Sequence, residues 1–76
     1  MKANKKSVPN DSSTDRVIAF VRDLIGRGEL RPGSRMPAER ELAALTGVSR
    51  PTVRAALHAL ATMGVVKTRH GAGTFI

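Results

Sequence analysis

The sequence of 76 residues contains no cysteine, no tryptophan and no tyrosine, and it has only two phenylalanines and two histidines. Without cysteine it cannot form a disulfide framework, a thiolate nucleophile or a zinc site with thiolate ligands. Two histidines cannot build a metal site by themselves, so we expect no metal and no cofactor. A chain of this length holds one small domain, which excludes large catalytic architectures.

Long apolar runs are missing as well. The longest apolar stretch, from Val17 to Ile25, is interrupted by Arg22 and Asp23. A membrane-spanning helix needs about 20 consecutive apolar residues, and the apolar part of a signal peptide needs about 7 to 15. We therefore expect a soluble, cytoplasmic protein with no membrane partner.

Acidic residues are absent from the chain after Glu41. All six lie between Asp11 and Glu41, whereas thirteen lysines and arginines give the chain a formal net charge of +7. The segment after Glu41 has no acid, and its cations are Arg50, Arg54, Lys67 and Arg69. Such a basic field attracts polyanions, above all nucleic acid. An anionic membrane is the competing partner, but these cations fall on two different segments and not on one amphipathic helix.

Two helices are expected in the first part of the chain. Residues 1–13 are polar and basic, and they predict a flexible tail. From Thr14 onward apolar residues recur at helical spacing, and Gly26 and Gly28 supply a stop, so a first helix is expected with Thr14 as its cap. The chain then turns, with room for a very short strand. A short second helix follows, with Pro37 in its first turn.

A third helix is expected after a tight turn. Gly47 should adopt the left-handed conformation that ends the second helix, and Ser49 should cap a helix over residues 50–63. One stripe of this helix is apolar, whereas the opposite face carries mostly small residues, with Arg54 near its start and His58 one turn further on. A face that serves only solubility would carry Glu and Lys. Small residues instead permit close approach to another surface.

The last segment, residues 65–76, predicts a β-hairpin, because two short β-prone stretches flank the glycine-containing turn HGAG. Three helices, with a tight turn before the third, followed by a hairpin describe a winged helix-turn-helix over residues 14–76. This is a mainly α fold with a small β-hairpin. The residues assigned to its core are Leu24, Leu42, Leu45, Val53, Leu57, Leu60 and Phe75.

Side chains able to contact DNA gather at the start of the third helix and in the hairpin, or wing. An arginine near the start of a helix in the major groove can donate two parallel hydrogen bonds to guanine O6 and N7. Hydroxyl groups there can donate to phosphates, and the wing residues can reach the DNA backbone or the minor groove. The residues placed for these contacts are Ser49, Arg50, Thr52, Arg54, Arg69 and His70.

The motifs PAERELA, GVSRPTVR and HGAGTF, with the glycine of MGVV before the last, resemble the N-terminal DNA-binding domain of GntR-family bacterial transcription regulators. The resemblance covers about residues 14–76, and the RHGAG wing is most similar to the FadR-like subgroup. It implies sequence-specific binding of double-stranded DNA in transcription regulation, with the helix over 50–63 in the major groove and the wing over 65–76 alongside. The DNA-contacting residues that it implies are Arg40, Ser49, Arg50, Thr52, Arg54, His70 and Gly71.

The resemblance also implies properties beyond these residues. The resemblance implies a two-domain protein whose C-terminal half binds a small effector and dimerises. That half is missing here. A homodimer on an inverted repeat with GT and AC half-sites is implied, whereas the isolated domain is expected to be a monomer. The sequence departs from the family at Ala55, where Glu is common. The contacts of that acid are therefore absent, and the orientation of Arg54 is left open.

Other interpretations of the same residues remain. From the sequence alone, Arg40 also fits a solvated or salt-bridged surface charge, and we favour plain surface exposure for His58. Nothing groups a nucleophile, a base and oxyanion donors, which argues against an enzyme. The alternative function is a winged-helix module that contacts protein, or RNA, without sequence-specific DNA binding. RNA readers usually offer aromatic platforms, whereas both phenylalanines are assigned to the core. A protein contact predicts binding that is insensitive to salt, whereas DNA binding predicts a steep loss of affinity as the salt concentration rises.

Overall fold

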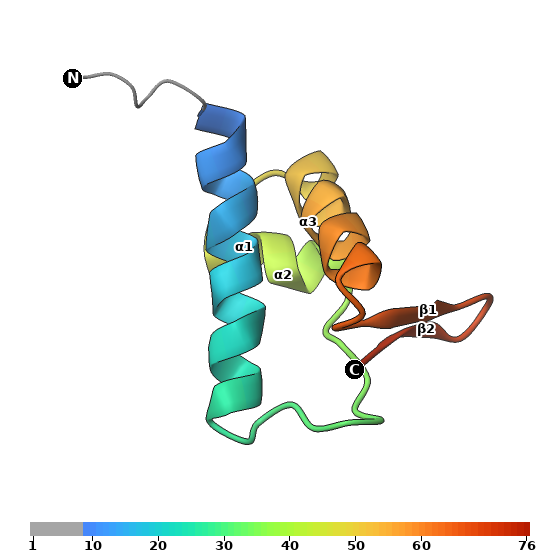
Figure 1. Cartoon of the computed structure of the whole chain (residues 1–76). Helices are drawn as coiled ribbons and strands as arrows, with labels where there is room; N and C mark the ends of the chain where they lie inside the picture. The colour runs from blue at the N-terminus through green and yellow to red at the C-terminus, as the bar shows by residue number, and fades with distance from the viewer. Residues whose placement is uncertain (1–8) are drawn as a thin grey trace.

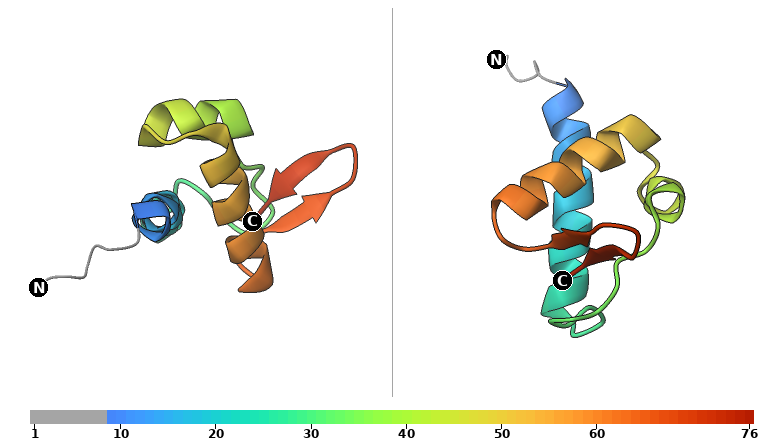
Figure 2. Two further views of the ribbon diagram at one scale, coloured as in Figure 1. Left: turned by 90° about the horizontal axis from the view of Figure 1, so that it is seen from above. Right: turned by 90° about the vertical axis from the view of Figure 1, so that its right-hand side faces the viewer.

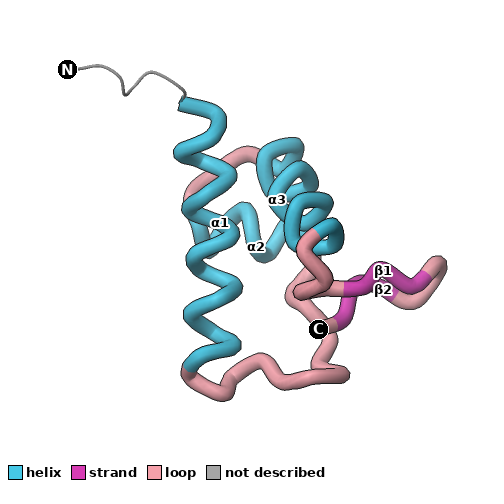
Figure 3. Tube along the Cα trace, in the orientation of Figure 1, coloured by secondary structure: helices cyan, strands magenta, loops and turns pink. Residues whose placement is uncertain are grey.

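The computed structural model describes residues 9–76 of the chain. Three helices come first and two strands last (Figure 1), and their bounds are α1 Pro9–Gly26, α2 Glu39–Thr46, α3 Arg50–Thr62, β1 Lys67–Arg69 and β2 Gly73–Phe75. A long loop joins α1 to α2, and a short turn joins α2 to α3 (Figure 3). This arrangement confirms the expected winged helix-turn-helix. No helix in this part of the chain is both long and apolar enough to cross a membrane.

The first helix begins earlier than expected. The expected start at Thr14 is wrong, because α1 begins at Pro9 and Thr14 lies inside the helix. Proline suits the first helical position, since its fixed φ is already helical and its missing N–H would have no partner there. Of the tail expected over residues 1–13, residues 9–13 are helical, and residues 1–8 lie outside the described residues.

The turn between α2 and α3 forms as expected. Gly47 has a left-handed φ of +74°, and its N–H donates to the carbonyl of Ala43 at 2.9 Å, which ends α2. Ser49 is extended, and its Oγ accepts a hydrogen bond from the backbone N–H of Thr52 at 3.3 Å, which caps α3. The two local signals therefore fix where one helix stops and the next starts.

The start of α2 differs by two residues from the expectation. Pro37 was expected in its first turn, but it precedes the helix, whose N-cap residue is Ala38 in an extended conformation. The cause lies in the preceding residue, because the N–H of Met36 donates to the carbonyl of Thr74 at 2.7 Å. This strand-like pairing holds the chain extended as it enters α2.

The wing is an antiparallel hairpin joined on one side by a third short segment. Its register pairs Lys67 with Phe75, Thr68 with Thr74, and Arg69 with Gly73. On the other side of β2 an isolated bridge pairs Arg35 with Phe75. The segment between the first two helices, which has room for a very short strand, thus forms a single bridge and no strand, and this bridge ties the wing to the body of the domain. β1 is left as the outer edge.

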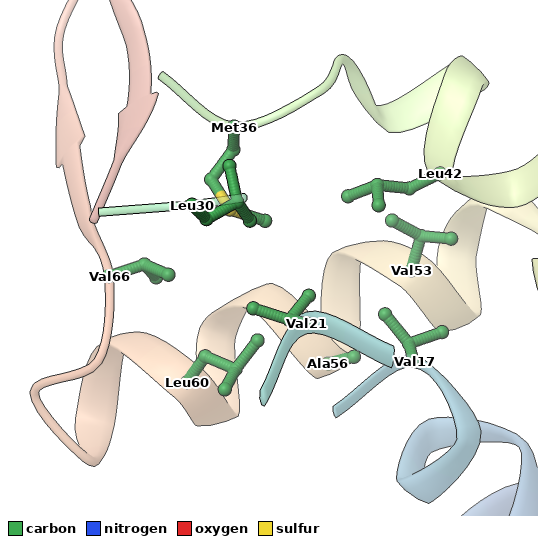
Figure 4. Packing of buried hydrophobic residues seen from close by; sticks show 9 residues of the cluster. All are labelled: Val17, Val21, Leu30, Met36, Leu42, Val53, Ala56, Leu60 and Val66. Carbon is green, nitrogen blue, oxygen red and sulfur yellow. The ribbon is translucent and has the colours of Figure 1, made fainter. Parts of the chain in front are cut away.

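The core lies where the three helices meet. Nine apolar side chains are buried there (Figure 4), and they are Val17, Val21, Leu30, Met36, Leu42, Val53, Ala56, Leu60 and Val66. No polar or charged side chain is buried among the residues that the structure describes. Seen along α1, α3 lies between α1 and the hairpin (Figure 2). One side of α3 therefore packs on α1, and the opposite side is turned outward, next to the wing.

The expected core is confirmed in part. Leu42, Val53 and Leu60 are fully buried, whereas Leu24, Leu57 and Phe75 are only partly buried. The assignment of Leu45 to the core is wrong, because 56% of this residue is exposed. α2 is eight residues long, and Leu42 is its one buried residue, so the last turn of this helix runs past the core. Phe20 is also only partly buried.

Candidate nucleic-acid interface

The outward side of α3 carries few large side chains. Its exposed residues are Arg50, Pro51, Arg54, Ala55, His58, Ala61 and Thr62. The two arginines lie one turn apart in the first two turns, and the later turns present small groups around His58, which is exposed as expected. α3 therefore offers a narrow outward surface with its positive charge at the N-terminal end, where the helix dipole is also positive.

The cap of α3 also supplies a free hydroxyl hydrogen. The Oγ of Ser49 and the Oγ1 of Thr52 lie 2.9 Å apart, so one hydroxyl donates to the other. Each hydroxyl has a single hydrogen to donate. One of the two hydrogens therefore remains for an outside acceptor at the exposed start of the helix.

A carboxylate on α2 binds both arginines of α3. The Nε of Arg54 donates to Oε2 of Glu39 at 2.9 Å, and the Nη2 of Arg54 donates to Oε1 at the same distance. The Nε of Arg50 donates to Oε1 at 3.2 Å. The pair with Arg54 is the bidentate arrangement that gives arginine–carboxylate bonds their geometric specificity.

The ionisation of Glu39 reflects these contacts. The hydrogen bond from Arg54, supported by the one from Arg50, holds the pKa of the Glu39 carboxyl below its ordinary value, against the opposing effect of desolvation. The same hydrogen bond raises the pKa of Arg54. Glu39 is therefore a charged acceptor at neutral pH, and it balances one of the two adjacent positive charges.

Arg40 lies next to this cluster on α2. Its side chain is exposed, and it shares with Arg50 the lining of a shallow hollow between α2 and the start of α3. No ion pair involves Arg40 within residues 13–76, whose side chains the structure describes. Among these residues Arg40 is therefore a solvated surface charge and not a salt-bridged one. Its guanidinium is accessible to an anionic partner.

The wing residues lie apart from this cluster. Arg69 lies over the ring of Phe75, with Cζ 5.7 Å from the ring centroid, so its position is steadied by a cation–π contact. His70 and Gly71 form the exposed turn at the end of the hairpin. Gly71 has a φ of +76°, and a Cβ placed there would meet no atom within 4 Å. The tip of the wing is therefore free for a close approach by another molecule.

A groove separates α3 from the wing. It is lined by Glu39, Arg54 and His58 on the helical side and by Thr68 and Thr74 on the hairpin side. The expected site residues thus form two groups, one on each side of this groove. Ser49, Arg50, Thr52 and Arg54 lie with Arg40 around the start of α3, and Arg69, His70 and Gly71 lie in the wing.

Comparison with protein families identifies the domain. The model of a family described as bacterial regulatory proteins, gntR family, matches residues 13–76. The chain belongs to the GntR family. The resemblance that the three sequence motifs indicate is thereby confirmed.

Curated relatives of this GntR domain are transcription regulators of greater length. The Uxu operon transcriptional regulator of Escherichia coli is 45% identical over 60 residues, which are 79% of this chain and 23% of that protein. The HTH-type transcriptional regulator Mce2R of Mycobacterium tuberculosis is 51% identical over 67 residues, which are 88% of this chain and 26% of that protein. The chain spans about a quarter of the length of these relatives.

Solved structures share the fold of this GntR domain. The crystal structure of AraR(DBD) in complex with operator ORR3 superposes with a TM-score of 0.78 and 33% identity, over 84% of this chain and 77% of that chain. A GntR structure from Streptococcus agalactiae gives a TM-score of 0.74 and 35% identity, over 83% of this chain and 31% of that chain. These likenesses confirm the winged-helix architecture.

Sequence patterns do not single out Glu39 of this GntR domain. It lies 11 residues before Arg50 and 15 before Arg54, and in the sequence it is simply one of two acids near a helix start. The available signal is indirect: two arginines at i and i+4 share one side of α3, and the tight turn brings the start of α2 beside them. The orientation of Arg54, which Ala55 leaves open, is set by Glu39.

Proposed function

We propose that this GntR domain binds double-stranded DNA in a sequence-specific way, as part of transcription regulation. The observation that carries the proposal is the exposed pair Arg50 and Arg54 at the start of an otherwise small-sided helix. Such a helix fits the major groove, which is about 12 Å wide, and its first residues meet the base edges. Crystal structures of the similar AraR(DBD) in complex with operators support the proposal.

In the proposed complex α3 lies in the major groove and the wing lies alongside it. Arg50 and Arg54 reach guanine O6 and N7, where arginine donates two parallel hydrogen bonds. The other contacts, to phosphates or to the minor groove, position the domain. They are assigned to Arg40, Ser49, Thr52, Arg69, His70 and the backbone of Gly71.

For the whole protein the proposal is a homodimer on an inverted repeat with GT and AC half-sites. Two-fold symmetric proteins match such repeats, because each protomer reads one half-site. Pairing is assigned to parts of the protein outside this chain, so the isolated domain is a monomer. The RHGAG wing supports a FadR-like subgroup, and the bacterial regulators among its relatives support a cytoplasmic location, where bacterial DNA lies.

Fluorescence anisotropy of the 76-residue chain tests the proposal. A labelled duplex with a GT/AC inverted repeat and a scrambled duplex are each titrated across a salt series. We expect tighter binding to the repeat, and a loss of affinity with salt whose slope reflects the phosphates contacted. Equal binding to both duplexes contradicts this half-site assignment. No binding to either duplex at low salt contradicts DNA binding and favours a protein-contact module.

A further inference from the structure

We infer that Glu39 is a specificity-determining residue: it touches no base, and it positions Arg54 and Arg50 so that they read bases. The inference rests on the proposed DNA binding and goes beyond it, because it assigns selectivity to a carboxylate that lies outside the set of DNA-contacting residues. Four features of the structure support it.

Arg54 uses one edge of its guanidinium for Glu39 and keeps the other edge free. Its Nε–H and one N–H of Nη2 are bonded to the two carboxylate oxygens. A guanidinium has five N–H groups, so three remain, two on Nη1 and one on Nη2. The edge formed by Nη1 and Nη2 still presents two parallel N–H groups, which is the pattern that guanine O6 and N7 accept. Glu39 thus fixes the plane of Arg54 without using the edge that reads a base.

The same carboxylate holds Arg50. Oε1 accepts from both Arg54 Nη2 and Arg50 Nε, at 2.9 and 3.2 Å. Two cations one helical turn apart would otherwise repel each other, and each free arginine side chain carries about 2 kcal/mol of rotamer entropy. Glu39 therefore orders both side chains before DNA arrives, which removes part of the ordering cost from the binding step.

The carboxylate lies behind the guanidinium groups. The side chain of Glu39 is 23% exposed, whereas those of Arg50 and Arg54 are 56% and 66% exposed. Its backbone is anchored as well, because Glu39 opens the helix whose Leu42 is fully buried. A duplex therefore meets the two cations first, and the group that orients them stays on a rigid element.

The charge of Glu39 works against general DNA affinity. A negative charge near the phosphates is repelled by any duplex, whatever its sequence. Removal of this charge should therefore leave the affinity for unrelated DNA unchanged or increase it. The same removal should reduce the discrimination between DNA sequences. A residue that served only the fold, or only general attraction, would not produce this pattern.

Parallel selections from a random duplex pool test the inference with the wild-type chain, Glu39→Gln and Glu41→Gln. Glu41 is the matched control, because it lies on the same turn, loses the same charge, is exposed, and takes no part in the ion pairs found within residues 9–76. We expect the wild type and Glu41→Gln to enrich one motif. For Glu39→Gln we expect the ratio of affinities for that motif and for an unrelated duplex to fall about tenfold, the cost of one disturbed bidentate base contact.

The outcomes separate the inference from the proposed function. Unchanged discrimination by Glu39→Gln overturns the role of Glu39, while the wild-type motif leaves DNA reading intact. A wild-type selection that yields no motif overturns DNA reading itself. To separate positioning from folding, Glu39→Gln is also combined with Arg54→Ala, and circular dichroism checks that each variant keeps its helices. In that background Glu39→Gln can act only through the single hydrogen bond that holds Arg50, so the further loss of discrimination should be smaller than in the wild type. A loss that is again tenfold would assign Glu39 a general structural role.

Discussion

Single residues of this domain act in pairs that the chain brings together from a distance. Glu39 and Arg54 are 15 residues apart, yet they form the bidentate contact that orients the outward side of α3. Two arginines share one carboxylate, so the first two turns of α3 keep an unbalanced positive charge. The side chains of Glu39, Arg50 and Arg54 therefore both attract a polyanion, through their net positive charge, and hold one another in fixed positions.

Replacement of Arg50 separates base reading from phosphate contact. We expect Arg50→Ala to cost about 1 to 3 kcal/mol on the selected duplex, because a bidentate base contact is lost, and much less on an unrelated duplex. The comparison is Arg69→Ala in the wing, which should weaken binding to both duplexes alike and make the dependence on salt less steep. Equal losses for Arg50→Ala on both duplexes would assign Arg50 to a phosphate.

The stability of the domain should depend on pH through Glu39. The pKa of its carboxyl is lowered in the folded state from an ordinary value of 4.5. A lowered folded pKa stabilises the protein above the unfolded pKa, and this contribution is lost as the pH falls through the folded value. We therefore expect the melting temperature of the wild type to exceed that of Glu39→Gln at neutral pH, and the difference to shrink as the pH falls below 4.5.

Thermal unfolding followed by circular dichroism, from neutral to acidic pH, measures this difference. Glu41→Gln serves as the control for the loss of one carboxylate from the same turn, because Glu41 takes no part in the ion pairs found among the described residues. A difference between the wild type and Glu39→Gln that stays constant into acid would contradict the ion pair as its source.

At the scale of elements, the ends that could be predicted are those set by local chemistry. Gly47 and Ser49 carry their own signals, a residue suited to a positive φ and a hydroxyl that accepts an N–H. The start of α1 was missed because the polar composition of its first residues indicates a tail, whereas Pro9 is also a good first helical residue. The polar composition of these residues indicates a tail, whereas the proline indicates the start of a helix.

Contacts between elements were out of reach of sequence patterns. Leu45 fits the apolar stripe of α2, but whether a short helix buries its last turn depends on where its neighbours end. The pairing of Glu39 with two residues of α3 depends on the crossing of two helices. The fold and the cationic residues were predictable, and the carboxylate that arranges those residues was not.

Two glycines of the wing should differ in their tolerance of alanine. Gly73 has a φ of +120°, and a Cβ there would lie 3.0 Å from the Nε of Arg35, so that Arg35 would have to move. Gly71 is the matched control, since its φ is also positive but its Cβ would meet nothing within 4 Å. We expect both substitutions to destabilise the domain, and Gly73→Ala to cost about 1 to 3 kcal/mol, more than Gly71→Ala.

Urea unfolding of the two variants checks this order. A further variant, Gly73→Ala with Arg35→Ala, removes the side chain that the new Cβ would meet, and it should recover part of the loss. Equal destabilisation by the two alanines would mean that the loss of stability comes from backbone strain alone, with no contribution from the contact with Arg35.

For the whole molecule, stability rests on a core of nine mostly aliphatic side chains that contains no aromatic residue. Small proteins are stable by roughly 0.05 to 0.15 kcal/mol per residue, so one core substitution removes a large share. We expect Leu42→Ala, at a fully buried position, to cost about 2 to 5 kcal/mol. Leu45→Ala, three residues along the same helix and 56% exposed, should cost little. Urea unfolding of both chains measures the contrast, and similar losses would contradict the division of α2 into a buried and an exposed part.

The outer edge of the wing bears on how copies of the domain behave beside one another. β2 is paired with β1 on one side and bridged to Arg35 on the other, so of the two strands β1 is the one with a free edge for sheet extension. β1 consists of Lys67, Thr68 and Arg69, all exposed. Cations on a short edge strand oppose its pairing with the edge of another molecule. The charges that suit the wing to a polyanion thus also guard the folded protein against edge-to-edge aggregation.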